Sequence, residues 1–297
     1  MAERAMFRDR VIAWGARLGL ALFRAMPLAA ASDFGGWLGR HLGPLFKVHQ
    51  IAARNLARAM PELSEEQRKT VLRGMWDNLG RVVGEYAHLA DINIDAKDEP
   101  GSVVVTGLEH FEQLRASGKP VIFISAHFGN WEVMSLVASR HGFPLVHVYR
   151  AANNPFVEEI LQELRKPVGG RHIPKGTEAA RELIRALKRT EYLGMLVDQK
   201  LNNGIAVPFF GRDAMTTPAP AEFALKAECP VVMAHVERLG GARFRVVIDK
   251  PIHFENTGDR ERDVYNAMLL INRTIEGWIR QRPDHWFWVH KRWPKGS

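Results

Sequence analysis

The feature that most constrains the fold is a series of short apolar runs separated by stretches with helical character. Each run is the length of a buried strand and ends beside polar residues. The runs lie at 103–105, 121–125, 145–149, 192–197, 231–236 and 244–248. Because neighbouring parallel strands need a crossover connection, usually a helix, this alternation predicts an α/β fold with a mostly parallel, mixed sheet flanked by helices. Gly240-Gly241 predicts a hairpin between the last two strands.

Helix signals fill the intervals between these runs. Ser64, followed three residues later by Gln67, predicts a capping box at the start of a helix over 64–90. Thr217 with Pro218 predicts another helix start, since proline is tolerated in a first turn. The remaining helices are expected over 107–117, 131–140, 155–165, 177–189 and 260–280, the fourth of them capped by Thr177.

Residues 1–60 differ in character from the rest of the chain. They carry nine Lys/Arg and three Asp/Glu, which is +6 of a total net charge of +8. Arg10, Arg17 and Arg24 recur every seven residues on one helical face, and an apolar set lies on another face: Val11, Trp14, Leu18 and Leu22. This pattern predicts a basic amphipathic helical segment that associates with an anionic membrane surface, followed by one α/β domain over 61–297. Packing of this helix on the protein's own core is the alternative.

Composition excludes several other classes of protein. Cys229 is the single cysteine, so the chain has no intramolecular disulfide framework and no thiolate-rich metal site. Residues 280–297 carry a second basic excess of five Lys/Arg against one Asp. Basic residues that flank apolar stretches, without a nucleic-acid-binding motif, favour lipid over nucleic acid as the anionic partner.

The strongest candidate for chemistry is the segment from Ser125 to Glu132, Ser-Ala-His-Phe-Gly-Asn-Trp-Glu. His127 follows an apolar strand, at the edge where open α/β sheets bind their ligands. Glu132 is expected in the first turn of the next helix, and Gly129 permits a tight turn between the two. A carboxylate that accepts one ring N–H fixes the imidazole tautomer and leaves the other nitrogen to remove a proton. A structural histidine at a strand end is the alternative interpretation.

Two more predicted strands end in polar residues. Tyr149-Arg150 closes one and Asp198-Gln199 closes another. Arg150 could hold a phosphate or an oxyanion, and Asp198 could orient Arg150 or a substrate hydroxyl. Downstream, residues 207–212 are expected to be an exposed apolar loop that lines an acyl chain, with ordinary core packing as the alternative. The aromatic and cationic residues of 285–293 are typical of a headgroup interface.

Five of these segments, in this order, resemble the late acyltransferases of lipid A biosynthesis, the lauroyl and myristoyl transferases of Gram-negative bacteria. They are Arg54-Asn55-Leu56 with Pro61-Glu62-Leu63, His127 through Glu132, Tyr149-Arg150 with Asn154-Pro155, Asp198-Gln199 with Val207-Pro-Phe-Phe-Gly211, and Trp286 through Arg292. The resemblance implies acyl transfer from acyl-carrier protein to a hydroxyl of a lipid A precursor, with His127 and Glu132 as the catalytic dyad. It implies neither a metal nor a cofactor beyond the acyl-acyl-carrier protein itself.

With this resemblance we assign four residues to substrate binding: Arg150, Asn154, Asp198 and Gln199. The expected partners are acyl-carrier protein, a phosphorylated glycolipid and an anionic membrane surface, and the expected location is the cytoplasmic face of the inner membrane. The phosphatidylinositol mannoside acyltransferases are similar over the same core, which leaves a glycolipid acyltransferase that uses acyl-CoA as an alternative. A metal-dependent hydrolase with His127, Glu132 and Asp198 as ligands is a second one.

Overall fold

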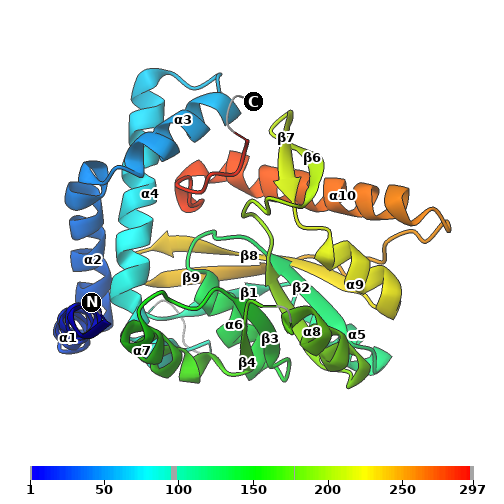
Figure 1. Ribbon diagram of the computed structural model, residues 1–297, viewed down its shortest axis with the longest axis horizontal. Coiled ribbons are helices and arrows are strands. Elements are labelled where there is room, and N and C mark those ends of the chain that lie inside the picture. Colours follow the sequence, from blue (N-terminus) through cyan, green and yellow to red (C-terminus); the bar gives the residue numbers. More distant parts are fainter. Residues whose placement is uncertain (1, 95–98, 177, 295–297) are drawn as a thin grey trace.

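The computed structural model describes residues 2–94, 99–176 and 178–294. Its helices and strands follow one another from a helical N-terminal part into a region of alternating strands and helices (Figure 1). The α-helices are α1 (Ala2–Arg24), α2 (Leu28–Leu42), α3 (His49–Ala59), α4 (Glu65–Tyr86), α5 (Glu109–Ser117), α6 (Trp131–Arg140), α7 (Pro155–Arg165), α8 (Ala179–Lys188), α9 (Ala219–Ala227) and α10 (Arg260–Gln281). The strands are β1 (Val103–Thr106), β2 (Val121–Ser125), β3 (Leu145–Tyr149), β4 (Arg171–Pro174), β5 (Tyr192–Leu196), β6 (Ile205–Phe209), β7 (Arg212–Thr216), β8 (Val231–Gly240) and β9 (Arg243–Ile248).

Seven of the strands form one mixed sheet in the order β1-β9-β8-β2-β5-β3-β4. Every neighbouring pair is parallel except β8 and β9, which form the antiparallel hairpin expected from Gly240-Gly241. The predicted α/β class and the mostly parallel, mixed sheet are therefore confirmed. β2 and β5 are neighbours, so the segments that follow them emerge side by side at one edge of the sheet.

The core is divided by this sheet into two layers. Alternate residues of β2 show the division, because Val121 and Phe123 pack with α5 and α6, whereas Ile122 and Ile124 face the opposite side. That opposite side is larger and is filled by α3, α4, α8, α9, α10 and the C-terminal residues. All five residues of β2 are buried, which explains why this strand is an uninterrupted apolar run up to Ser125.

Most of the predicted elements are confirmed, and the boundaries agree closely where local signals exist. The Ser64–Gln67 capping box forms at the start of α4, and Gly118 ends α5 in the left-handed conformation. Thr177, the expected cap of α8, lies outside the described residues. The expected exposed loop at 207–212 is wrong: this segment is the β6–β7 hairpin, in which Phe209 and Phe210 are buried.

The C-terminal segment also differs from the expectation of a headgroup interface. Trp286, Trp288 and Arg292 are among the largest fully buried side chains of the molecule. Arg292 donates to the Met215 carbonyl and the Thr216 hydroxyl and lies over the Phe209 ring. Trp293 is buried as well. The segment therefore belongs to the hydrophobic core, where burial of three tryptophans removes a large apolar surface from water.

Helices α2 and α4 pack side by side, so closely that their backbones are in contact (Figure 1). Small residues face each other at every turn, so that a Cβ added to Gly80 would lie 2.1 Å from the Gly35 carbonyl oxygen and one added to Gly84 would lie 2.3 Å from that of Ala31. A capping box and an apolar face predict α4 itself but not this close approach. The boundary between an N-terminal segment and an α/β domain at residue 60 stays a prediction.

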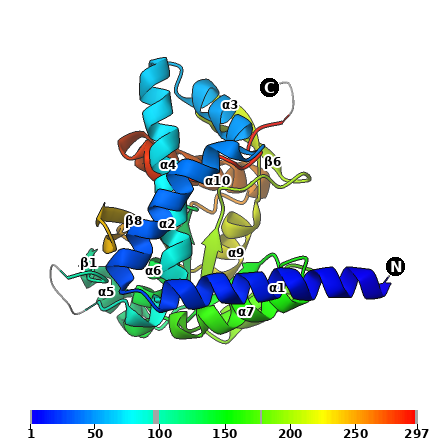
Figure 2. The ribbon, with the colours of Figure 1, turned by 90° about the vertical axis from the view of Figure 1, so that its left-hand side faces the viewer.

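Helix α1 runs along α7 (Figure 2), and its inward side consists of small and apolar residues, among them Ala13, Leu20 and Phe23. Arg10 lies over the Phe156 ring, and Arg24 pairs with Asp91. The opposite face is apolar and exposed; it consists of Phe7, Val11, Trp14, Leu18 and Leu22, each more than half exposed. An ordinary surface helix buries its apolar face, whereas α1 leaves this second apolar face open to its surroundings. Among the described residues no helix is both long enough and apolar enough to cross a bilayer.

Candidate active site

His127 and Asp198 meet at the carboxyl edge of the sheet. His127 lies two residues beyond β2 and Asp198 lies two residues beyond β5, and the Val197 amide donates to the Ser125 carbonyl at 3.1 Å, which keeps the two segments aligned past the strand ends. His127 Nδ1 is 2.8 Å from Asp198 Oδ1. The His127 backbone N–H donates to Asp198 Oδ2 at 3.0 Å, so one carboxylate holds both the ring and the main chain of the histidine.

Asp198 is held in its ionised form. Its side chain is fully buried, and Trp286 Nε1 donates to Oδ2 at 2.8 Å in addition to the two donors of His127. Burial alone would raise the pKa of Asp198, but the nearby His127 imidazole and these N–H donors hold it well below its usual range. A buried carboxylate that accepts the Nδ1–H of a histidine leaves the lone pair of Nε2 available on the opposite side of the ring.

The backbone after His127 is fixed by the C-terminal segment. The Phe287 amide donates to the His127 carbonyl at 3.2 Å, and the Gly129 amide donates to the His285 carbonyl at 3.0 Å. Gly129 has φ +58°, and a Cβ there would lie 2.0 Å from the Val236 carbonyl oxygen. Glycine is therefore required at this turn, both for the left-handed backbone and for the close approach of β8.

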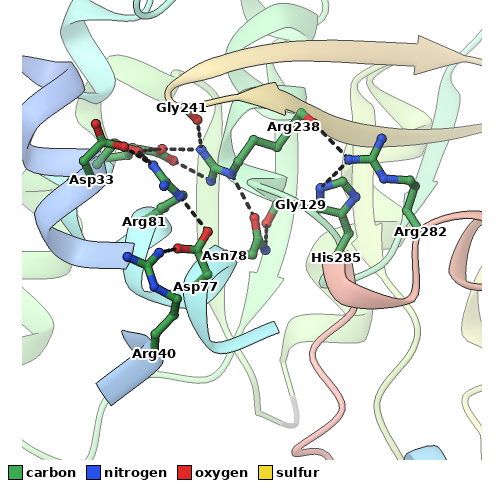
Figure 3. A network of polar contacts seen from close by, with 12 residues as sticks. Asp33, Arg40, Asp77, Asn78, Arg81, Gly129, Arg238, Gly241, Arg282 and His285 are labelled. Carbon is green, nitrogen blue, oxygen red and sulfur yellow. Dashed lines mark hydrogen bonds and ion pairs between the residues drawn. The ribbon is translucent and has the colours of Figure 1, made fainter. Parts of the chain in front are cut away.

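A buried polar network holds the same loop from its other side (Figure 3). Asn78 donates to the Gly129 carbonyl at 3.1 Å and accepts from Arg238 Nε at 3.1 Å, and Arg238 also donates to the Gly241 carbonyl. Arg238 forms a bidentate ion pair with Glu85, whose carboxylate also accepts from Asn130 Nδ2 at 2.8 Å. The network thus ties the loop that follows His127 to α4 and β8.

The open side of the His127 ring faces Gln199 and His290. Gln199 Nε2 lies 3.2 Å from His127 Nε2 and 3.5 Å from His290 Nε2. The rings of His127 and His290 are 5.0 Å apart, and Trp131 lies edge-on to His127 at 5.2 Å. Burial lowers the pKa of His290 to about 4, although Asp198 opposes this effect, so His290 is neutral at neutral pH.

Glu132 does not pair with His127, which corrects the predicted dyad. It does lie in the first turn of α6, but its carboxylate accepts from Arg165 Nη2 at 2.9 Å and is bonded to the Tyr86 hydroxyl. Successive helical residues project about 100° apart, so Trp131 occupies the side of α6 that faces His127 and Glu132 is directed toward α4 and α7. The partner of His127 is Asp198.

The Glu132 cluster is a second buried polar site. Burial raises the pKa of Tyr86, and the neighbouring Glu132 carboxylate adds to this rise. Burial alone would lower the pKa of Arg165, but Glu132 and Tyr86 raise it above its usual range. Arg165 also lines a cavity of about 350 Å³ between α7, β3 and β4, together with Tyr149, Gln162, Lys166, His172 and Pro174.

The other predicted binding residues fall in two groups. Asp198 and Gln199 contact His127, as described above. Arg150 is exposed just beyond β3 and makes no hydrogen bond or ion pair within the described part of the chain. Asn154 caps α7 by accepting from the Phe156 amide at 3.0 Å, and it donates to the Asp9 carbonyl of α1 at 2.8 Å. Both polar atoms of Asn154 are therefore engaged, the oxygen in capping α7 and the nitrogen in joining α7 to α1.

Within the described residues, one group of side chains has the geometry of a metal-binding donor set. It consists of His127, Asp198 and His290, whose ligand atoms all lie within 4.8 Å of one another. Glu132, the third ligand in the hydrolase alternative, is not part of this group. Both Asp198 oxygens already accept N–H groups of His127 and Trp286, so the carboxylate acts here as a partner of the imidazole.

Comparison with known proteins identifies the family. A family model described as bacterial lipid A biosynthesis acyltransferase matches residues 3–295. The chain belongs to this family. It is 23% identical over 295 residues to a lipid A biosynthesis acyltransferase of Haemophilus influenzae, covering 93% of this chain and 86% of the relative. It is 24% identical over 253 residues to the lipid A biosynthesis lauroyltransferase of Escherichia coli K12, covering 82% and 78%, and 23% identical over 283 residues to the palmitoleoyltransferase of that strain, covering 92% and 88%.

The resemblance inferred from the sequence is thus confirmed, and the protein is an acyltransferase. Sequence reasoning missed two residues of the acyltransferase site described here, His290 and Trp286, although both lie in the C-terminal motif that carried part of the resemblance. It also missed Arg165 and Tyr86 as the partners of Glu132. The sequence signals for these residues were the histidine and tryptophans of the C-terminal segment and the arginine at the end of α7. Neither signal indicates which other side chains these residues contact.

Proposed function

We propose that this acyltransferase moves a fatty acyl group from acyl-carrier protein to a hydroxyl of a phosphorylated lipid A precursor, with His127 as the general base. The observation that supports this assignment is the His127–Asp198 pair, in which the 2.8 Å contact to a buried carboxylate leaves Nε2 as the basic nitrogen. Asp198 takes the orienting role that the sequence suggested for Glu132. Family membership supports lipid A biosynthesis as the process.

The reaction proceeds by direct attack of the acceptor. His127 Nε2 removes the hydroxyl proton as the oxygen attacks the thioester carbonyl, and the resulting tetrahedral centre carries the negative charge. Collapse breaks the C–S bond, and the imidazolium returns its proton to the departing thiolate. The charge of Asp198 stabilises the imidazolium between these two steps. These steps form one ester and consume one thioester, with no acyl-enzyme and no cofactor.

Glu132 has a different task in this scheme. It holds Arg165 and Tyr86 in the buried cluster, which joins α6 to α7 and α4. We propose that Glu132 is needed for activity because it fixes the start of α6, directly after the loop that carries His127. Its carboxylate has no part in proton transfer.

The function is tested by combining activity with product analysis. His127→Ala is expected to lower acyl transfer from acyl-acyl-carrier protein by about 10²–10⁴-fold, the usual contribution of a general base. His253→Ala, a change at an exposed histidine, is the matched control and should retain full activity. Mass spectrometry of lipid A from cells with and without the protein gives the mass of the acyl group. Near-normal activity of His127→Ala would overturn the mechanism, and an unchanged lipid A mass would overturn the acceptor.

We propose that the protein attaches to the cytoplasmic face of the inner membrane, and the exposed face of α1 supports attachment to a membrane surface. Its outward side chains are apolar and its arginines are exposed, so the helix presents both the apolar and the cationic groups that a headgroup–acyl boundary binds. Trp14→Glu with Leu18→Glu is expected to abolish sedimentation with anionic phospholipid vesicles. Leu270→Glu, at a comparably exposed leucine of α10, should leave it unchanged. Equal vesicle binding by all three proteins would contradict this attachment.

A further inference from the structure

His290 lies beside the proposed base, His127. Among the described residues, it forms no hydrogen bond with Asp198. Its position is fixed by its main chain, because Asn55 Nδ2 of α3 donates to the His290 carbonyl at 2.6 Å and to the Trp288 carbonyl at 2.7 Å. Its ring packs edge-on against Phe287 at 4.8 Å and against His127 at 5.0 Å. A neutral imidazole is therefore held with Nε2 directed to the same carboxamide that faces the base.

Hydrogen-bond chemistry selects one arrangement of the three side chains. Asp198 takes the Nδ1–H of His127, so Nε2 of His127 has a lone pair and needs a donor. The NH₂ group of Gln199 offers two hydrogens, one for His127 Nε2 and one for His290 Nε2. With the carboxamide turned around, its oxygen would face the lone pair of His127. Two facing lone pairs repel, so the NH₂ group faces His127, and its second hydrogen is then directed to His290 Nε2, which acts as the acceptor.

We propose that His290 is a positioning residue for acyl transfer, which acts by holding the NH₂ group of Gln199 toward His127. This inference rests on the proposed role of His127 as base. When the acceptor hydroxyl binds, the amide hydrogen that faced His127 Nε2 turns to the hydroxyl oxygen, which frees the nitrogen and aligns the hydroxyl with it before the proton moves. The second amide hydrogen stays on His290 and keeps the carboxamide in register. His290 itself neither gains nor loses a proton in the reaction.

A double-mutant cycle separates this role from an independent one. In the whole chain, Gln199→Ala and His290→Phe are each expected to lower kcat about 10²-fold, the cost of a misplaced reacting group or a lost donor. If His290 acts through Gln199, the double variant loses no more than Gln199→Ala alone. His290→Gln, whose side-chain oxygen reaches the place of Nε2 as an acceptor, should recover most of the activity. Losses that multiply in the double variant would overturn the proposal.

A spectroscopic measurement tests the same contact without activity. In protein labelled with ¹⁵N-glutamine, the side-chain NH₂ resonances of Gln199, assigned by their loss in Gln199→Glu, should move in His290→Phe and return toward their original positions in His290→Gln. Unmoved resonances in His290→Phe would also refute the contact. If instead the wild-type protein lacked acyl-transfer activity while the resonances moved, the proposed function would fail and the hydrogen-bond arrangement would stand.

Discussion

Replacing Asp198 with asparagine would alter one atom and reverse the direction of one hydrogen bond. Oδ2 of Asp198 accepts from the His127 amide at 3.0 Å and from Trp286 Nε1 at 2.8 Å, so the oxygen of an asparagine would keep that position. Its NH₂ group would then take the place of Oδ1, 2.8 Å from His127 Nδ1. Nδ1 would have to become an acceptor, and the ring proton would move to Nε2, the nitrogen that must be unprotonated to act as base.

The size of the effect follows from what the wrong tautomer removes. General-base assistance contributes about 10²–10⁴-fold, and the corresponding change in a Ser-His-Asp triad costs about 10⁴-fold for the same reason. We therefore expect Asp198→Asn to lower kcat by about 10³-fold, equivalent to about 4 kcal/mol of transition-state stabilisation at 1.36 kcal/mol per factor of ten. The KM for acyl-carrier protein should change little, because the carboxylate is buried behind the histidine.

The assay is initial-rate acyl transfer from acyl-acyl-carrier protein, with urea denaturation of each variant to confirm folding. Asp213→Asn, at an exposed carboxylate of β7, is the matched control and should behave as the wild type. A folded Asp198→Asn protein with a kcat within about threefold of wild type would refute the tautomer argument.

Three further predictions concern stability. Glu85→Gln should lower the free energy of unfolding by about 3–5 kcal/mol, because it leaves Arg238 buried without its charged partner, and adding Arg238→Met should restore part of the loss in a denaturant titration. Gly80→Ala should destabilise the protein by about 1–3 kcal/mol because its Cβ would lie 2.1 Å from the Gly35 carbonyl oxygen, whereas Gly277→Ala, with no atom within 4 Å of its Cβ, should stabilise by up to about 1 kcal/mol. Unfolding free energy measured at several pH values should fall from pH 6.5 to pH 4, by up to about 1.4 kcal/mol per pH unit for each histidine, because the unfolded chain binds protons in this window that the folded one does not. The histidines concerned, whose pKa burial lowers to about 3 or 4, are His147, His235, His285 and His290; a flat profile would contradict this account.

The fold was predictable wherever short-range rules decide it. The capping box of α4, the left-handed glycine after α5 and the buried run of β2 each depend on a few consecutive residues, and the structure has all three. The β6–β7 hairpin was not predicted, because a Phe-Phe-Gly turn flanked by apolar residues has the same pattern as a surface loop. The buried tail was misinterpreted for a similar reason: tryptophan beside arginine suits both a membrane interface and a core in which the arginine donates hydrogen bonds and stacks on an aromatic ring.

The candidate site was half predictable. Strand order places His127 and Asp198 together, and the expectation that polar strand ends share one edge of the sheet holds for this pair. The partner of His127 could not be chosen from the sequence, because Glu132 is five residues away along the chain and Asp198 is far more distant. The direction of Glu132 is set by the helical rotation after Trp131, which depends on where α6 begins. That starting residue is fixed by tertiary contacts of Asn130 and Gly129.

The antiparallel β-bridge between Phe128 and Trp286 has a consequence for the synthesis of the protein on the ribosome. About half the chain separates its two sides, so at ordinary translation speeds of about 5–20 residues per second the ribosome needs roughly 10–30 s to deliver the second after the first. Until Trp286 is made, the Asp198 carboxylate lacks the indole N–H that it later accepts at the same oxygen as the His127 amide. A nascent chain that has already settled on the bilayer would consequently be unable to modify its lipid neighbours until the tail arrives, which delays the onset of chemistry beyond the formation of the sheet.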